Sequence, residues 1–501
     1  MKKSSWLSGL KKKRRPGRPG GSRRSRSRTD GTARSAELLE SRIVLAAPTL
    51  APISDLAFLS GSPIHIPLNG ADADGDALTF TVTSNNPILT TEVREGNRSL
   101  RITVLQGDAG SPTISGEMTF ELFEDEASRA TNRVITLAES GFYDGSTFHR
   151  VVNNFVIQGG DPNGNPPGTG GSTLGNFDDQ FDVDLQHNTT GMLSYAKSID
   201  DTNDSQFFIT EFDPDFIFPA VGNQPAESSE VKLRRLDSNH SVFGAQTTGE
   251  AIRAAISDTA LTGGAPSVDV VMTSVEIFVD EQNGVLRISA PEGTNLLEPA
   301  IVTVTVSDGN ETAQQSFNVT FTPDNFDSDP FLSDLPTTIR TLANTGTTFQ
   351  LTAIDAEVVI AAFLDEDFMK NRVDMFGNPA PIFVPVDANP AEVSYDVGFS
   401  SGLVSVQPAN SFIGTTRFTV ATAEFTDAVD YQVVSVDVVA AAAPLVVSTA
   451  DHPGLTEAND GDADEIRVRR NGTVLEVVVN GQLTAQAEFQ SVTTLTIDGS
   501  R

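Results

Sequence analysis

The sequence predicts a mainly β, multidomain protein, and three observations support this. The chain has 501 residues, more than a single compact core usually holds. It contains 40 Gly and 27 Pro, a content typical of many tight turns. Short runs with an apolar residue at every second position, such as ALTFTVTS at 77–84, recur through most of the chain. This alternation is typical of half-buried strands.

Charge is distributed unevenly along the chain. The first 47 residues hold 14 Lys and Arg against 3 Asp and Glu, whereas the other 454 hold 20 against 64. A body this acidic repels nucleic acid and anionic membrane surfaces, so neither is expected as a partner. The chain has no run of 18 apolar residues, which argues against a transmembrane helix. Because it has no Cys, disulfides, thiolate catalysis and Cys-bound metals are excluded.

The basic first segment indicates targeting rather than nucleic-acid binding. Its end, AELLESRIVLAAP at 36–48, resembles an N-terminal stretch of large bacterial surface and exported proteins. That resemblance implies an exported protein, located in the periplasm, on the cell surface or outside the cell.

The hydrophobic pattern divides the chain into segments. The alternating runs at 48–110 and 282–323 resemble immunoglobulin-like or cadherin-like β-sandwich modules, and together they have the length of one such module. The stretch between them is mixed: SRATNRVITLAES and GEAIRAAIS predict helices, and Gly141 is the expected C-terminal stop of the first. The predicted segments are a basic export segment (1–47), the first part of a sandwich (48–110), a mixed domain (111–281), the second part of the sandwich (282–323), a second sandwich-like module (330–442) and a short β-rich C-terminal segment (445–501).

Four sequence blocks in the mixed domain point to one chemistry. They are FYDGSTFHRVVNNFVIQGGDP at 142–162, GTGG at 168–171, MLSYAKSIDDTNDSQFFIT at 192–210 and HSVFG at 240–244. In order and composition they resemble the cyclophilins, over about 170 of the 501 residues. The resemblance implies a closed barrel of eight strands and two helices, and peptidyl-prolyl cis/trans isomerase activity without a cofactor. The implied partners are proline-containing peptides or unfolded protein segments.

The resemblance also implies a role for individual residues. Arg150 would be the catalytic guanidinium, since twisting an X-Pro bond needs a hydrogen-bond donor beside the prolyl nitrogen and neither a nucleophile nor a metal. Without the surrounding motif, each residue has a simpler interpretation. An Arg in a strand is usually a surface residue, Phe155 and Phe208 would be aromatic residues of the core, and His240 would be a structural histidine. The implied substrate-binding residues are His149, Phe155, Val156, Gln158, Ala196, Lys197, Gln206, Phe208, Leu236 and His240.

Three positions depart from the family pattern. Val156 replaces the usual Met, Lys197 the usual Asn, and Arg235 a Trp that many members carry. An insertion at about 213–234 directly precedes Arg235 and is expected to reshape the rim of the pocket.

Two function classes remain open from the sequence. One is an isomerase that assists the folding of exported proteins, and the other is a surface or adhesive protein whose cyclophilin domain mainly binds proline peptides. Asp72, Asp74 and Asp76, and NDGDAD at 459–464, have oxygen-rich spacing compatible with Ca²⁺, or are simply solvated turns. Five His in the whole chain leave little for a zinc site.

Overall fold

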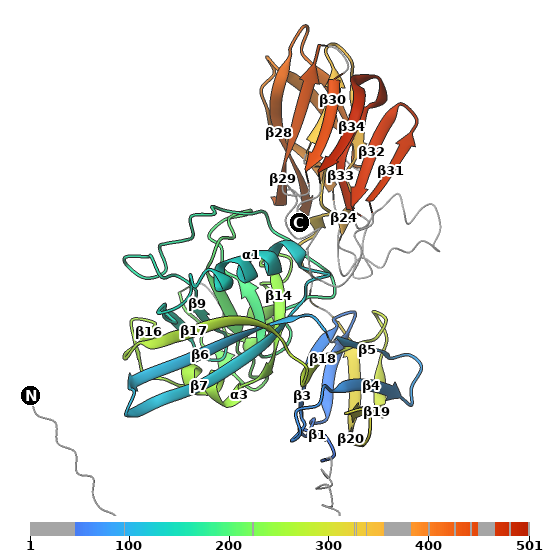
Figure 1. Ribbon diagram of the computed structural model, residues 1–501. Helices are drawn as coiled ribbons and strands as arrows, with labels where there is room; N and C mark the ends of the chain where they lie inside the picture. The colour runs from blue at the N-terminus through green and yellow to red at the C-terminus, as the bar shows by residue number, and fades with distance from the viewer. Residues whose placement is uncertain are drawn as a thin grey trace, which may run out of the picture. The chain divides into compact units, whose positions relative to one another are not determined.

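The structure is a computed structural model (Figure 1). It describes residues 46–354 apart from 95, 223, 224, 325, 327 and 337, and residues 382–498 apart from 399, 400, 425, 426, 441, 442, 449–465, 480 and 481. The basic segment 1–45 and the acidic stretch 459–464 therefore lie outside the described residues. No helix in the described part combines the length and the hydrophobicity needed to cross a membrane.

An eight-stranded antiparallel sheet forms the central part of the chain, and it curls until its edges meet. In spatial order its strands are β17 (Val270–Val279), β6 (Arg98–Asp108), β7 (Ser111–Leu122), β14 (Val242–Thr248), β10 (Met192–Tyr195), β11 (Phe207–Thr210), β9 (Val156–Gly159) and β8 (Arg150–Val152). Thr147, just before β8, forms a bridge with Val271 of β17 and so joins the two edges. We call this sheet and its helices the barrel.

Three helices accompany the barrel: α1 (Ser128–Glu139), α2 (Ser229–Arg234) and α3 (Glu250–Ser257). The two predicted helices are α1 and α3, and α1 ends beside Gly141, whose φ of 72° suits glycine. The short α2 lies inside the insertion and was not predicted. Two small strand pairs complete this part: β12 (Ile217–Phe218) with β13 (Glu227–Ser228), and β15 (Leu261–Thr262) with β16 (Ala265–Pro266).

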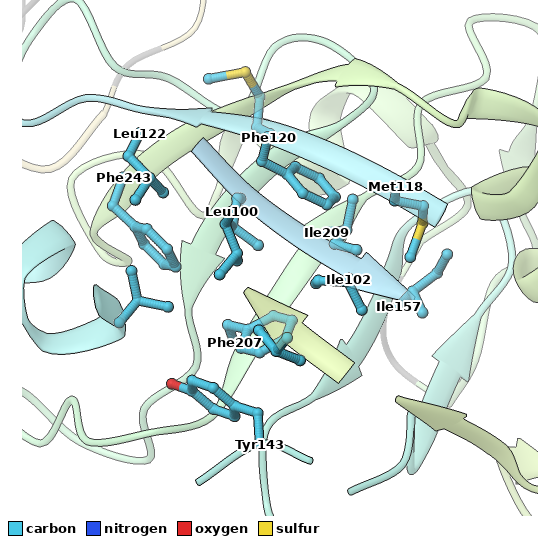
Figure 2. Close-up of a cluster of buried hydrophobic side chains, with 14 of the residues drawn as sticks. Leu100, Ile102, Met118, Phe120, Leu122, Tyr143, Ile157, Phe207, Ile209 and Phe243 are labelled. Carbon is cyan, nitrogen blue, oxygen red and sulfur yellow. The ribbon is translucent and has the colours of Figure 1, made fainter. Parts of the chain in front are cut away.

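Apolar side chains fill the interior of the barrel (Figure 2). Strand alternation brings Leu100 and Ile102 of β6 to the same interior as Phe120 of β7, and all three are fully buried. Tyr143 is buried there too and donates a hydrogen bond to the carbonyl of Ser205 (3.1 Å). The core that supports the site is therefore closely packed with aromatic and branched side chains.

Strands from both sides of the barrel segment pair with each other. One sheet has the order β1 (Thr49–Leu50), β3 (Ile64–Ala71), β18 (Asn283–Ser289), β5 (Thr90–Arg94), and the other β2 (Leu56–Ser60), β20 (Thr312–Pro323), β19 (Leu296–Ser307), β4 (Thr79–Ser84). Buried side chains of the two sheets form one hydrophobic cluster. We call these eight strands the two-sheet module.

The expected boundary at 110 differs from the observed one. The strand at 98–108 was assigned to the sandwich, but as β6 it pairs with β7 and β17 in the barrel sheet. Its pattern RSLRITVLQ alternates as a sandwich strand would, and alternation alone does not say which sheet a strand joins. The change of sheet falls between β5 and β6.

The C-terminal strands are also arranged differently from the predicted segments. β22 of the 330–442 module pairs in parallel with β33 of the 445–501 segment, so the two share a sheet. That sheet has the order β25 (Ile382–Ala388), β28 (Gly414–Glu424), β29 (Asp427–Val439), β22 (Thr338–Leu342), β33 (Gln482–Glu488), β32 (Val474–Val479), β31 (Ile466–Asn471). The remaining elements are β23 (Thr347–Gln350), β27 (Leu403–Pro408) and β26 (Val393–Val397) in one sheet, the pairs β21 (Phe331–Leu332) with β24 (Ala353–Ile354) and β30 (Ala443–Ser448) with β34 (Val492–Asp498), and a 3₁₀ turn at Phe489–Ser491.

Candidate active site

A row of hydrogen-bonded side chains runs from β8 across β9 to Gln206, the residue directly before β11. The antiparallel register places Arg150 of β8 opposite Gln158 of β9, and the guanidinium donates to Gln158 Oε1 (3.2 Å). Gln158 Nε2 donates to Gln206 Oε1 (3.1 Å), and Gln206 Nε2 donates to the carbonyl of Gly170 (2.9 Å). Each amide thus fixes the next, and Arg150 at the end of the row is exposed to solvent.

An apolar cluster lies next to this row and contains three of the predicted pocket residues. Phe155, Val156 and Phe208 are buried together with Leu233, which comes from α2 in the insertion. Partly buried hydrophobic residues packed against this cluster are Val152, Ala196, Phe212, Phe218 and Leu236. The cluster thus groups apolar side chains of the kind that pack against a proline ring.

His240 closes the cluster on one side. Its ring packs edge-to-face on Phe208, with ring centroids 5.4 Å apart. Its Nδ1 donates to the carbonyl of Tyr195 (2.9 Å), which fixes the orientation of the ring. Burial, with a smaller contribution from neighbouring His187, lowers the pKa of His240 to about 4. His240 is therefore a neutral wall at physiological pH.

The insertion adds a rim that the sequence indicated only in outline. Phe218 of β12 packs edge-to-face on Phe155, with centroids 6.3 Å apart. The ammonium of Lys232 lies 5.1 Å from the Phe155 ring centroid and 3.2 Å from a carboxylate oxygen of Glu227. Arg235, which stands where many cyclophilins have Trp, is exposed and pairs with Glu227 at 2.6 Å. The rim thus consists of one aromatic ring and three charged groups.

The glycine-rich loop at 168–171 is shaped by a buried carboxylate. Asp161 accepts backbone hydrogen bonds from Gly164 (2.7 Å), Gly168 (2.7 Å) and Gly170 (2.9 Å). Burial alone would raise the pKa of Asp161, but these bonds lower it overall. A Cβ at Gly164 would lie 1.9 Å from the Asp161 carboxylate, so a side chain is excluded there. The sequence motif contained Asp161, but its role appears only in the fold.

The loop lines a groove with a cavity of about 530 Å³. Predicted residues in its wall are Gln158, Ala196, Lys197 and Gln206. The Ala196 amide donates to the carbonyl of Gln206 (2.9 Å), so this N–H group already has a hydrogen-bond acceptor within the protein. The ring of His149 lies against the loop, since a Cβ at Gly168 would come within 3.2 Å of it. Of the predicted site residues, His149 thus contacts the loop and not the apolar cluster.

The side chain of Lys197 is directed to carboxylates. Its ammonium bonds to Asp179 and lies 3.3 Å from Asp200, and the side chain is almost fully buried. Asp179, Asp200 and Asp201 are also the one acidic grouping in the described part of the chain that is close enough to hold a metal. Because the Lys197 ammonium already pairs with two of the three, the grouping has its cation.

Comparison with known proteins adds the decisive observation. A family model described as "Cyclophilin type peptidyl-prolyl cis-trans isomerase/CLD" matches residues 110–277. A putative peptidyl-prolyl cis-trans isomerase of Staphylococcus aureus (strain USA300) is 36% identical over 206 residues, which cover 39% of this chain and 98% of the relative. The chain belongs to the cyclophilin-type peptidyl-prolyl cis-trans isomerase family. The predicted fold class and isomerase activity are thereby confirmed.

The chain is also similar to other proteins. A putative isomerase of Staphylococcus haemolyticus (strain JCSC1435) is 37% identical over 177 residues, covering 33% of this chain and 88% of the relative. A crystal structure of a Cryptosporidium parvum cyclophilin-type isomerase is 25% identical and covers 38% of this chain and 99% of that one, with a TM-score of 0.30. The family model ends at residue 277 and leaves the flanking β modules unassigned.

The candidate Ca²⁺ residues form a turn after β3. Asp72 Oδ1 accepts from the amides of Asp74 (2.8 Å) and Asp76 (3.3 Å), so this oxygen serves the turn itself. The carboxylates of Asp72, Asp74 and Asp76 do not form a metal-holding group among the described residues. Ca²⁺ binding there stays a prediction.

Proposed function

We propose that Arg150 is the catalytic group of this isomerase and that Phe155, Val156 and Phe208 of the apolar cluster, together with Leu236 and His240, hold the proline ring. The observation that carries the proposal is the row from Arg150 through Gln158 to Gln206, since Gln158 shares β9 with Val156 of the cluster and Gln206 directly precedes the strand of Phe208. The exposed guanidinium has donors left for a bound peptide, because Arg carries five N–H groups.

The physical basis is the electronic change at the prolyl nitrogen. Rotation about a peptide bond faces a barrier of about 18–20 kcal/mol, because resonance gives the C–N bond double-bond character. In the twisted state that resonance is lost and the nitrogen gains a lone pair. Arg150 donates to this lone pair only in the twisted state, which is differential binding of the transition state. A charged hydrogen bond contributes about 1.5–3 kcal/mol, so the desolvating pocket must supply the rest.

Replacing the guanidinium tests this assignment. Arg150→Ala should lower kcat/KM for an X-Pro tetrapeptide at least tenfold, about 1.4 kcal/mol of transition-state stabilisation. The matched control is Arg101→Ala, which removes an Arg from β6 that pairs with Glu117 and Glu276. Near wild-type activity of Arg150→Ala, measured in a protease-coupled assay, would show that another group is catalytic.

The same variant separates the two function classes. If the domain serves mainly as a peptide-binding module, Arg150→Ala removes isomerisation and leaves the biological role intact. We favour catalysis that assists the folding of exported proteins, because Arg150 and both glutamines of the row are in place. Slower proline-limited refolding of a client protein with Arg150→Ala than with the intact enzyme is the expected result, and equal refolding rates favour the binding module.

The proposal includes export of the protein from the cytoplasm. Its support is the basic head with AELLESRIVLAAP at 36–48, followed by the strongly acidic body. Residues 1–47 fused to a reporter enzyme that is active only after export should give activity in a bacterial host. The matched control replaces the apolar patch Ile43-Val44-Leu45 with serines. A reporter that stays in the cytoplasm with both fusions would contradict the targeting role.

A further inference from the structure

Arg234, the last residue of α2, is buried between the insertion and the two-sheet module. Only 4% of it is exposed. Its guanidinium donates to Asp324 Oδ2 (2.7 Å), directly after β20, and to Ser62 Oγ (2.5 Å), between β2 and β3. The ring of Phe326 lies 5.4 Å from the guanidinium carbon. We call residues 98–279, from β6 to β17, the isomerase segment. A side chain of this segment is thus held by residues that precede and follow it in the chain.

The same guanidinium also reaches toward the pocket. Its Nε lies 3.2 Å from Asp237 Oδ2. The other oxygen of Asp237 accepts from the backbone amide of His187 (2.5 Å) and from its Nδ1 (3.0 Å). Since a carboxylate can only accept, Nδ1 of His187 carries the proton. Arg234 therefore donates a hydrogen bond to Asp324 on one side and forms a buried ion pair with Asp237, the partner of His187, on the other.

His187 supports the apolar cluster directly. Its ring stacks on Phe208, with centroids 5.6 Å apart and planes 25° apart, and its Nε2 lies 3.0 Å from Ser194 Oγ. Phe208 in turn contacts His240 on its edge. The orientation of the imidazole plane of His187 therefore determines where the Phe208 ring lies.

Asp237 also belongs to the turn that carries two pocket residues. The Leu236 amide donates to the Leu233 carbonyl (2.8 Å), and the His240 amide donates to the Leu236 carbonyl (2.9 Å). Asp237 lies between Leu236 and His240 in this turn, so fixing its carboxylate fixes the turn. A buried guanidinium shared by two carboxylates is costly to disrupt, because loss of one partner leaves a buried charge uncompensated.

We propose that Arg234 is a positioning residue through which the two-sheet module sets the shape of the proline pocket. The proposal rests on the proposed function, which assigns Phe208, Leu236 and His240 to that pocket. Arg234 does not touch substrate in this scheme. Its effect is transmitted through Asp237 and His187, so the two-sheet module contributes to peptide affinity although it carries none of the predicted pocket residues.

The test uses the full chain and changes only the distant partner. Asp324→Asn keeps the shape of the side chain and removes the charge that holds Arg234. We expect KM for an X-Pro tetrapeptide to rise about fivefold or more while kcat changes less than twofold. Ser62→Ala, which removes a single hydroxyl, should give a smaller rise in KM.

Variants of Arg234 itself extend the test. The KM of Arg234→Lys should fall between those of wild type and Arg234→Gln, because an ammonium keeps the charge but not the planar fork.

The matched control is Arg94→Gln. Like Arg234, Arg94 of β5 is a buried Arg whose ion pair joins the two-sheet module to the barrel, here at Glu126, but Asp237 is not among its ion-pair partners. It should leave KM unchanged. Unchanged KM in both Asp324→Asn and Ser62→Ala, with circular dichroism showing a folded chain, would overturn the proposal.

Two further measurements keep this test separate from the catalytic assignment. Peptide affinity is titrated in the Arg150→Ala background, so the effect of Asp324→Asn on the pocket is read whether or not Arg150 is the catalytic group. The Nδ1–H proton of His187 is followed by NMR. Its signal should shift in Asp324→Asn and stay in place in Arg94→Gln, and an identical shift in both variants would indicate a general structural change instead.

Discussion

At the scale of single residues, the site depends on which groups stay neutral and which stay charged. Arg150 keeps its charge and its exposure, while His240 is partly buried against Phe208 as a neutral imidazole. Neutrality suits a wall that a proline ring covers, because a charge there would lose its hydration when the peptide binds.

The lowered pKa of His240 predicts a pH profile. Its folded-state pKa of about 4 lies below the ordinary value of 6.5, so the neutral form is maintained from about pH 5 upward. The stability linked to this group is present above pH 6.5 and is lost as pH falls through 4, because the unfolded state binds the proton first. Peptide affinity should therefore stay constant between pH 5.5 and 8 and weaken near pH 4.

NMR exchange spectroscopy of a proline peptide measures this profile without a protease, so it works in acid. His240→Gln should remove the acidic limb, because an amide has no proton to gain in this range. A loss of affinity centred near pH 6.5 in the wild type would show that His240 titrates as an ordinary solvated histidine.

At the scale of elements, the sequence predicted what is local and missed what is distant. The stretch FHRVVNNFVIQGGDP forms β8, its turn and β9, so the residues that face each other across the hairpin were already neighbours in the motif. Helix α1 followed from its apolar spacing and from Gly141.

The errors concern pairings between remote segments. β6 joins the barrel because its partners β7 and β17 lie there, and no pattern within RSLRITVLQ carries that information. The roles of Leu233 and Arg234 were missed for the same reason. The insertion had no counterpart in the family pattern, and the partners of Arg234 are at Ser62 and Asp324, far along the chain in both directions.

At the scale of the whole molecule, the two-sheet module depends on both ends of the isomerase segment. β2 pairs in parallel with β20, and β18 pairs with both β3 and β5. Neither half contains a complete sheet. We therefore propose that the isomerase segment is inserted into one module, with the change of sheet at about 95–97 and again at 280–282.

Dissection of the chain tests the insertion. Residues 46–96 expressed alone should be unfolded by NMR, because their strands lack β18–β20, while 46–96 joined by a short linker to 283–324 should give a dispersed spectrum. The control is the same linked chain with Val302→Asp and Val304→Asp, which places two charges in the shared core. A dispersed spectrum from 46–96 alone would mean that each half folds independently.

The position of Asp324 directly after β20 has a consequence for the time order of synthesis. A growing chain emerges from its N-terminus, so every strand of the barrel is made before β20. Ser62 is made before the barrel, whereas Asp324, the carboxylate partner from the two-sheet module, is made after it. On the proposal above, the newly made isomerase reaches its full affinity for proline peptides only when the two-sheet module has folded. Full binding of other chains would thus begin only after the two-sheet module of the enzyme's own chain has folded.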